Sequence, residues 1–351
     1  MVSCATNSLV DRPLIGITMG DPLGVGPEVI VKSLADENLR CRARFVVFGL
    51  HEVLEVAADQ AEINPFWWRE PFDPQLRVSS GVLVADFDEL QPVRTNGERG
   101  PDALAGHASF RFVEEGARLL REGLLDALVT GPICKQSWHL ANHRFHGHTD
   151  FLTRCFDTRR INMLFVAGRL RVALASDHVP LFELRNRFTI GLVHQPIDLL
   201  DQALRAWFGI AAPRIGVLGL NPHAGEDGLL GDEERRIIIP ALDMARNAGL
   251  RVSGPLAPDT AFVPEVWQRF DGLVAMYHDQ GLIPIKAQAF ESAAQLTLGL
   301  DRIRASPAHG TAFDIAGKNR ARHGSMRAAI ELAIELAGAA CRQRGAPTVA
   351  R

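Results

Sequence analysis

Short apolar runs rich in β-branched and aromatic residues recur along the chain. They predict strands at residues 14–18, 45–50, 82–87, 127–130, 163–167, 172–175, 215–220 and 272–277. Between them, apolar residues recur at helical spacing, over residues 112–120, 232–247 and 325–337. This alternation predicts an α/β fold with a mostly parallel or mixed sheet.

Composition bounds the class of protein. The chain has 351 residues, of which 47% are hydrophobic and 23% charged, so it is expected to fold around a large core or two domains. Its 38 basic and 41 acidic residues are interspersed and leave a formal net charge of -3. No strong field therefore favours nucleic acid or an anionic membrane, and small molecules are the expected partners.

The cysteines and the N-terminus indicate the compartment. No two cysteines form a CxxC pair, so neither a disulfide framework nor a cysteine-based zinc site is indicated. The first ten residues lack the pattern of a signal peptide, and no apolar run approaches the roughly 18 residues of a membrane span. We expect a cytoplasmic protein.

Three histidines each follow a strand-like run: His178, His223 and His278. Imidazole suits zinc, cobalt and other divalent ions, and three protein nitrogens leave a position open for a substrate oxygen. Any one of these histidines could simply cap a strand, but the repetition favours a shared metal. Asp177 and Asp279 stand beside two of them, yet adjacent residues of a strand face opposite ways, which argues against their orienting the imidazoles.

Other polar residues are candidates for catalysis or for binding an anion. Lys135 follows a Thr-Gly-Pro turn and could be a general acid or base, although most lysines are only solvated. Lys286 and Arg304 would suit a phosphate or carboxylate, with surface ion pairs as the alternative. Gly24 and Gly26 could bring backbone amides to an anion or could only form a tight turn.

Taken together, these segments resemble the 4-hydroxythreonine-4-phosphate dehydrogenase family of pyridoxal phosphate biosynthesis, from about residue 14 to residue 337. The motifs that carry the resemblance are GITMGDPLGVGPEV (16–29), TGPICK (130–135), GHTDF (147–151), NPHAGEDGLLGDEE (221–234), PLAPDTAF (255–262), MYHDQGLIPIK (276–286) and HGTAFDIAGK (309–318).

The resemblance implies a two-domain isocitrate/isopropylmalate dehydrogenase-like fold. It implies an active-site cleft between the domains, completed by the partner subunit of a homodimer. Residues 1–130 with 290–351 would form a discontinuous cofactor-side domain, and residues 131–289 a domain for metal, substrate and dimerisation.

The resemblance also assigns site residues. One divalent metal (zinc, cobalt or magnesium) would be bound by His178, His223 and His278. The substrate contacts of the family correspond to His148, Thr149, Lys286, Arg304 and position 295. NAD or NADP would contact a loop containing His309, Gly310, Thr311 and Asp314, with Asp259 and Thr260 as further candidates.

The implied reaction oxidises 4-phosphooxy-L-threonine to a 3-oxo acid, which decarboxylates to 3-amino-2-oxopropyl phosphate. A metal would lower the pKa of the substrate hydroxyl and stabilise the enolate-like charge of the second step. The base is not readable from the sequence, and Lys135 is a speculative choice.

Two departures from the family pattern leave alternatives open. Gln295 stands where the family has a substrate-contacting asparagine, which puts the exact substrate in doubt. Arg320 and Arg322 follow the predicted adenosine loop and could accept the 2′-phosphate of NADP. A dehydrogenase of 4-phospho-threonate, 4-phospho-erythronate or a dihydrodiol carboxylate, a metallohydrolase, and a non-catalytic binding protein are the other interpretations.

Overall fold

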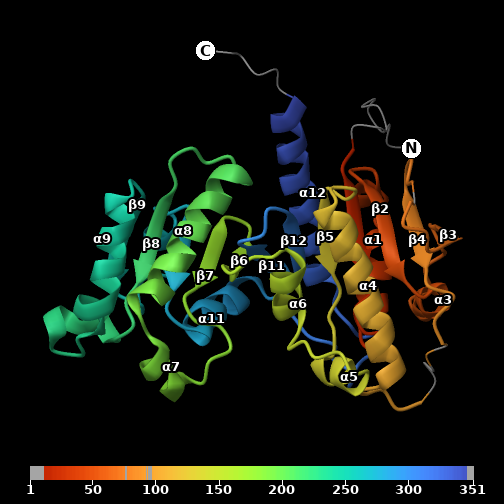
Figure 1. Ribbon diagram of the computed structural model, residues 1–351, viewed down its shortest axis with the longest axis horizontal. Coiled ribbons are helices and arrows are strands. Elements are labelled where there is room, and N and C mark those ends of the chain that lie inside the picture. The colour runs from red at the N-terminus through yellow and green to blue at the C-terminus, as the bar shows by residue number, and fades with distance from the viewer. Residues whose placement is uncertain (1–11, 76, 92, 94–96, 346–351) are drawn as a thin grey trace. The chain divides into compact units, whose positions relative to one another are not determined.

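The computed structural model describes residues 12–75, 77–91, 93 and 97–345. Its internal contacts divide the chain into two compact units (Figure 1). Unit 1 consists of Met1–Arg159 with Leu300–Arg351, and unit 2 of Arg160–Gly299. The predicted boundaries, after residues 130 and 289, differ because the segment that follows residue 130 packs on a helix of unit 1. The cofactor and dimerisation roles of the two parts stay predictions.

The strands of unit 1 form a parallel array. In spatial order they are β3 (Trp68–Pro71), β4 (Val82–Asp86), β2 (Arg44–Gly49), β1 (Leu14–Thr18), β5 (Ala127–Thr130) and β12 (Ile303–Pro307). All residues of β4, β5 and β12 are buried, as are all but the first of β1 and β2. Strands that are covered on both faces need continuous apolar runs. For this reason most of these strands could be predicted from the sequence.

The helices of unit 1 follow these strands. They are α1 (Gly26–Leu34), α2 (Glu37–Arg40), α3 (His51–Gln60), α4 (Ala103–Arg121), α5 (Lys135–Leu140), α6 (His148–Cys155) and α12 (Gly324–Gly345). The long helix α4 begins where the Asp102 carboxylate accepts a hydrogen bond from the Ala105 amide. It packs on β1 and β2 through one apolar face, and α5 and α6 pack on it in turn.

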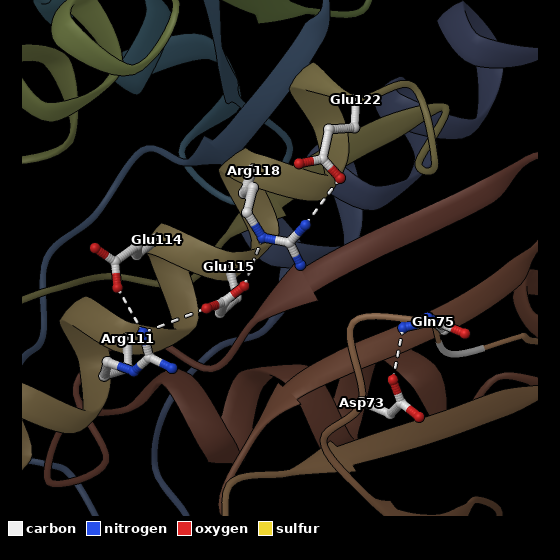
Figure 2. A network of polar contacts seen from close by, with 7 residues as sticks. All are labelled: Asp73, Gln75, Arg111, Glu114, Glu115, Arg118 and Glu122. Atoms are coloured by element: carbon white, nitrogen blue, oxygen red, sulfur yellow. Dashed lines mark hydrogen bonds and ion pairs between the residues drawn. The ribbon is translucent and has the colours of Figure 1, made fainter.

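The opposite face of α4 carries a chain of ion pairs (Figure 2). Arg111 contacts Glu114 at 2.7 Å and Glu115 at 3.3 Å. Arg118 contacts Glu115 and Glu122, both at 2.8 Å. Pairs three or four residues apart on a helix each add about 0.2–0.5 kcal/mol, so this face favours the helix without binding anything else.

Unit 2 contains a mixed sheet. In spatial order its strands are β11 (Ala294–Leu298), β6 (Asn162–Ala167), β7 (Leu170–Leu174), β10 (Gly272–Ala275), β8 (Arg214–Leu218) and β9 (Arg251–Leu256). The pairs β11–β6 and β6–β7 are antiparallel, whereas β7–β10, β10–β8 and β8–β9 are parallel. The α/β class and the mixed sheet predicted from the sequence are confirmed.

The helical segments of unit 2 include two unusual ones. They are α7 (Leu181–Arg187), α8 (Ile190–Ala206), the 3-10 segment η2 (Pro222–Gly228), the π-helical segment η3 (Glu234–Ile238), α9 (Ile239–Asn247), α10 (Pro264–Trp267) and α11 (His278–Ala289). Among the residues that the structure describes, no helix is both long and apolar enough to cross a membrane.

Candidate active site

The three histidines predicted to bind a metal all belong to unit 2 and follow neighbouring strands. Strand β10 lies between β7 and β8 and runs parallel to both, so the carboxyl ends of the three strands meet at one edge of the sheet. His178 follows β7, His223 follows β8 and His278 follows β10. In parallel sheets this edge is where ligand sites usually form.

His178 and His278 lie closest together. Their ring centroids are 5.5 Å apart and their planes are inclined by 40°. Two imidazoles that each bind one ion through a nitrogen about 2.1 Å away have ring centres about 5 Å apart. The spacing of these two rings therefore fits a shared divalent ion.

Asp279 contacts the ring of His278. The Nδ1 atom of His278 lies 2.6 Å from Oδ1 of Asp279, which leaves Nε2 for an ion. From the sequence, Asp279 was expected to face away from His278, as adjacent residues of a strand do. This expectation was wrong, because His278 is the first residue of helix α11. The corresponding contact between His178 and Asp177 is longer, at 3.8 Å.

His223 lies in an unusual backbone segment. Six consecutive residues have positive φ: His223 (51°), Ala224 (56°), Gly225 (81°), Glu226 (43°), Asp227 (56°) and Gly228 (98°). Left-handed helical conformation costs about 1–2 kcal/mol for each residue that is not glycine, so such a run needs compensating contacts. The imidazole of His223 is 64% exposed, against 61% for His178 and 34% for His278.

The structure brings together only part of the predicted ligand set. Within the described residues, no three His, Cys, Asp or Glu side chains are grouped closely enough to hold a metal ion. His178 and His278 are neighbours, and His223 lies at the end of the adjacent strand. The donor chemistry and the first two rings fit a divalent ion, while the third ligand stays a prediction.

Unit 1 contains a second cluster, of basic groups, at the ends of β5 and β12. Arg304 lies in β12 and is 3% exposed. Its guanidinium donates a hydrogen bond to the hydroxyl of Thr130, the last residue of β5. Burial lowers the pKa of Arg304 to about 9, so the side chain remains a cation at neutral pH.

His148 belongs to this basic cluster. It is the first residue of α6, and its pKa lies well below the usual value, because of burial and then because of the nearby charges of Arg304 and Lys135. Its Nε2 atom is buried and has no hydrogen-bond partner among the described residues. Thr149 follows in the same turn of α6. A buried imidazole beside two cations is arranged to receive an anion.

Asp21 is a buried carboxyl group near Lys135 that the sequence analysis did not single out. It accepts hydrogen bonds from the amide of Leu23 at 3.0 Å and from the hydroxyl of Ser137 at 2.9 Å. Burial raises its pKa to about 6. Because Ser137 lies in the first turn of α5, Asp21 fixes the start of the helix that carries Lys135.

The segments around Gly24 and Thr311 lie against each other in unit 1. The amide of Val25 donates to the carbonyl oxygen of Thr311 at 2.9 Å. A Cβ atom on Gly24 would lie 3.1 Å from the Thr311 side chain, so glycine permits this close approach. The structure therefore joins the glycine turn before α1 to the predicted cofactor loop.

Comparison with known proteins decides the family. Residues 41–333 match the family described as pyridoxal phosphate biosynthetic protein PdxA. The chain belongs to this family. It is 43% identical, over 93% of its length and 97% of the relative, to a D-threonate 4-phosphate dehydrogenase of Cupriavidus necator. It is 40% identical, over 92% of its length and 95% of the relative, to a 4-hydroxythreonine-4-phosphate dehydrogenase of Desulforapulum autotrophicum.

Solved structures agree with this assignment. The crystal structure of 4-hydroxythreonine-4-phosphate dehydrogenase from Klebsiella pneumoniae is similar, with a TM-score of 0.82 and 37% identity, over 93% of this chain and 98% of that one. The resemblance predicted from the motifs is confirmed. This PdxA-family chain is an oxidoreductase of the 4-hydroxythreonine-4-phosphate dehydrogenase type.

The remaining predicted residues of this PdxA-family chain lie on further elements of the two units. In unit 2, Lys286 is exposed on α11, and Gln295 is buried in β11, where its Nε2 atom donates to the Thr297 hydroxyl at 3.3 Å. Asp259 and Thr260, also in unit 2, lie in a turn after β9. Their roles stay predictions.

The rest of the predicted cofactor loop follows β12 in unit 1. It contains His309, Gly310, Thr311 and Asp314. The Nδ1 atom of His309 lies 3.0 Å from the carbonyl oxygen of Gly310. No contact within the described residues assigns this loop to a nucleotide, so its role stays a prediction.

Proposed function

We propose that this chain catalyses the metal-dependent, NAD(P)-linked oxidation of 4-phosphooxy-L-threonine. The product is a 3-oxo acid that decarboxylates to 3-amino-2-oxopropyl phosphate, a step of pyridoxine and pyridoxal phosphate biosynthesis. The observation that carries the proposal is the cluster of Lys135, His148 and the buried Arg304 in a PdxA-family chain.

The basic cluster supports a phosphorylated substrate. The guanidinium of Arg304 can donate charge-assisted hydrogen bonds to a phosphate, and His148 and Thr149 add hydrogen-bonding groups in the same unit. We assign the phosphate or carboxylate to these residues, with Lys286 as a further cationic contact. A dihydrodiol carboxylate has no phosphate and would make fewer charge-assisted hydrogen bonds with these residues.

We assign the metal to His178, His223 and His278. When bound, zinc, cobalt or magnesium would lower the pKa of the substrate hydroxyl and stabilise negative charge in the decarboxylation. Asp279 would orient His278 through Nδ1, and Lys135 would accept the hydroxyl proton. The proximity of His178 and His278 supports this assignment.

We assign NAD or NADP to the loop that contains His309, Gly310, Thr311 and Asp314, with Asp259 and Thr260 as further contacts. The contact between this loop and the glycine turn at Gly24 supports a nucleotide site near the start of α1. NADP remains an alternative to NAD, because Arg320 and Arg322 follow the loop and could bind the 2′-phosphate of NADP.

A second candidate substrate is D-threonate 4-phosphate. It has the same phosphate and the same oxidisable hydroxyl, and differs at the carbon that carries the amino group in the first candidate. Gln295, which replaces the family's asparagine, leaves the exact substrate open, and the 43% identity to a D-threonate 4-phosphate dehydrogenase favours this candidate. The interpretations as a metallohydrolase or a non-catalytic binder predict no nicotinamide reduction.

We also propose that the protein is a homodimer. Unit 2 exposes several large apolar side chains, namely Leu181 (62%), Phe182 (94%), Leu229 (82%), Ile283 (65%) and Phe290 (61%). Exposed apolar side chains that gather in one patch are typical of a subunit interface, and we propose that a second copy of the chain covers these five. The cleft between domains and the cytoplasmic location stay predictions.

The test is a spectrophotometric assay. The purified protein, supplied with zinc, cobalt or magnesium, is mixed with NAD or NADP and each of four substrates: 4-phosphooxy-L-threonine, D-threonate 4-phosphate, D-erythronate 4-phosphate and a dihydrodiol carboxylate. We expect reduction of the nicotinamide with the first, or with the second if Gln295 has changed specificity. No reduction with any of them would defeat the proposal.

A further inference from the structure

The backbone that leads into the left-handed turn of His223 is hydrogen-bonded to one carboxylate. Glu234, the first residue of η3, is 4% exposed. Its Oε1 atom accepts hydrogen bonds from the backbone amides of Leu220 and Asn221, both at 2.7 Å. Its Oε2 atom accepts a third from the side-chain amide of Asn221 at 2.8 Å. One buried side chain thus accepts hydrogen bonds from all three of these donors, between the end of β8 and the turn.

The fit between this carboxylate and the turn is close. A Cβ atom on Gly225 would lie 2.7 Å from Oε2 of Glu234, and one on Gly219 would lie 3.2 Å from Oε1. Glycine is therefore needed at both positions for the backbone to reach the carboxylate. The carboxylate and the turn are matched in shape as well as in hydrogen bonding.

The strained turn would otherwise be free to rearrange. Positive φ is an uncommon conformation for residues such as Ala224 and Glu226, and the side chains of His223 and Glu226 are exposed. Strained backbone persists only where the surroundings determine it, and it gathers at functional sites. The functional residue within this turn is His223.

We propose that Glu234 is the positioning residue for the His223 metal ligand. It holds the left-handed turn in place before the ion binds, so that His223 stays at the end of β8, next to the strand that leads to His278. The inference rests on the metal site of the proposed function. Residues that orient metal ligands typically change metal affinity by about 10–100-fold when they are replaced.

Glu233 provides a matched comparison. It is the neighbouring carboxylate and also accepts a hydrogen bond from the Asn221 side chain, at 2.8 Å, whereas the backbone amides of Leu220 and Asn221 donate to Glu234. Glu234→Gln keeps the shape of the side chain while replacing one acceptor oxygen with a donor that faces the Asn221 amide. Glu233→Gln makes the same chemical change without disturbing the turn.

The experiment measures metal affinity in the full-length protein. Metal-free wild type, E234Q and E233Q are titrated with Co²⁺, following the visible absorption of the bound ion, and Zn²⁺ is measured by competition. We expect E234Q to bind about 10–100-fold more weakly, with an altered cobalt spectrum, and E233Q to stay within about threefold of wild type. Hydrogen exchange at the amides of Leu220 and Asn221 should be faster in metal-free E234Q only.

The outcomes are separable. If the wild-type protein binds neither Co²⁺ nor Zn²⁺, the proposed metal site is wrong. Wild type that binds, with E234Q binding equally well, would overturn the role of Glu234. If E234Q does not fold, Asn221→Ser replaces it. This change removes the side-chain contacts with Oε2 of Glu234 and with Glu233, while both backbone hydrogen bonds to Oε1 of Glu234 remain, and E233Q controls for the altered Glu233 contact. We then expect a loss of about 3–10-fold, and unchanged affinity would overturn the inference.

Discussion

The rings of His178 and His278 lie with their centroids 5.5 Å apart because backbone hydrogen bonds continue beyond the strands that precede them. The amide of Ala175 donates to Ala275 at 2.7 Å. Both the amide and the hydroxyl of Ser176 donate to the carbonyl oxygen of Met276, at 3.2 and 2.8 Å. The pairing of β7 with β10 thus sets the spacing of the two backbone segments that carry these imidazoles.

Replacing His278 with alanine tests this pair. We expect the affinity for Zn²⁺ or Co²⁺ to fall by at least about 100-fold, because one of three nitrogen ligands is lost. His107→Ala is the control, since His107 pairs with His143 on the surface of unit 1. Isothermal titration calorimetry of the metal-free proteins measures the metal affinity of both variants. Equal metal affinity in wild type and H278A would exclude His278 as a ligand.

Asp279→Asn tests the orientation of the His278 ring. The carboxylate accepts from Nδ1 at 2.6 Å, and asparagine keeps the size but weakens the acceptor. We expect metal affinity to fall by about tenfold. Asp177→Asn, where the contact with His178 is 3.8 Å, should change it less. If both variants bind as wild type does, neither carboxylate orients a ligand.

Much of the fold could be predicted because most strands are buried on both faces. Every apolar run that predicted a strand is one. The strands that were missed lack such runs for physical reasons. Strand β3 is exposed throughout and β9 contains Gly254 and Pro255, and both lie at an edge of their sheet, where polar residues and proline are tolerated. Strand β12 buries Arg304, which no hydrophobic pattern reveals.

The site was less predictable because its geometry depends on contacts far apart in sequence. The strand-then-histidine repeat identified His178 and His278, and the parallel order of β7 and β10 explains why they meet. The left-handed turn at His223 depends on Glu234, whose three hydrogen bonds have no local signature. Asp21 and Ser137 likewise meet only through the fold.

Arg304→Gln tests the basic cluster as an anion site. Wild type should unfold at a higher temperature in millimolar inorganic phosphate, because a ligand that binds only the folded state stabilises it. R304Q should lose most of this increase, since a buried charge-assisted contact is removed. Arg302→Gln, two residues earlier and hydrogen-bonded to the Leu120 carbonyl, should keep it. An undiminished phosphate effect in R304Q would place the anion elsewhere.

The pH dependence of stability tests the environment of Asp21. Burial raises the pKa of this carboxyl from 3.8 to about 6, so between these values the folded protein binds the proton more tightly than the unfolded chain does. The stabilisation is therefore complete below about pH 4 and is lost as the pH rises through 6, by about 3 kcal/mol. The asparagine side chain of the Asp21→Asn variant does not titrate in this pH range. The difference in unfolding free energy, D21N minus wild type, should thus increase by up to about 3 kcal/mol between pH 4 and 7.

Ser137→Ala provides an independent check on the same carboxyl group. The Ser137 hydroxyl donates to Asp21 at 2.9 Å, and this hydrogen bond lowers the Asp21 pKa. Its removal should move the inflection in stability to a higher pH, because the ionised carboxylate loses a donor. Denaturant unfolding of wild type, D21N and S137A across this pH range measures both effects. Parallel curves for the three proteins would show that Asp21 titrates as an ordinary carboxyl group.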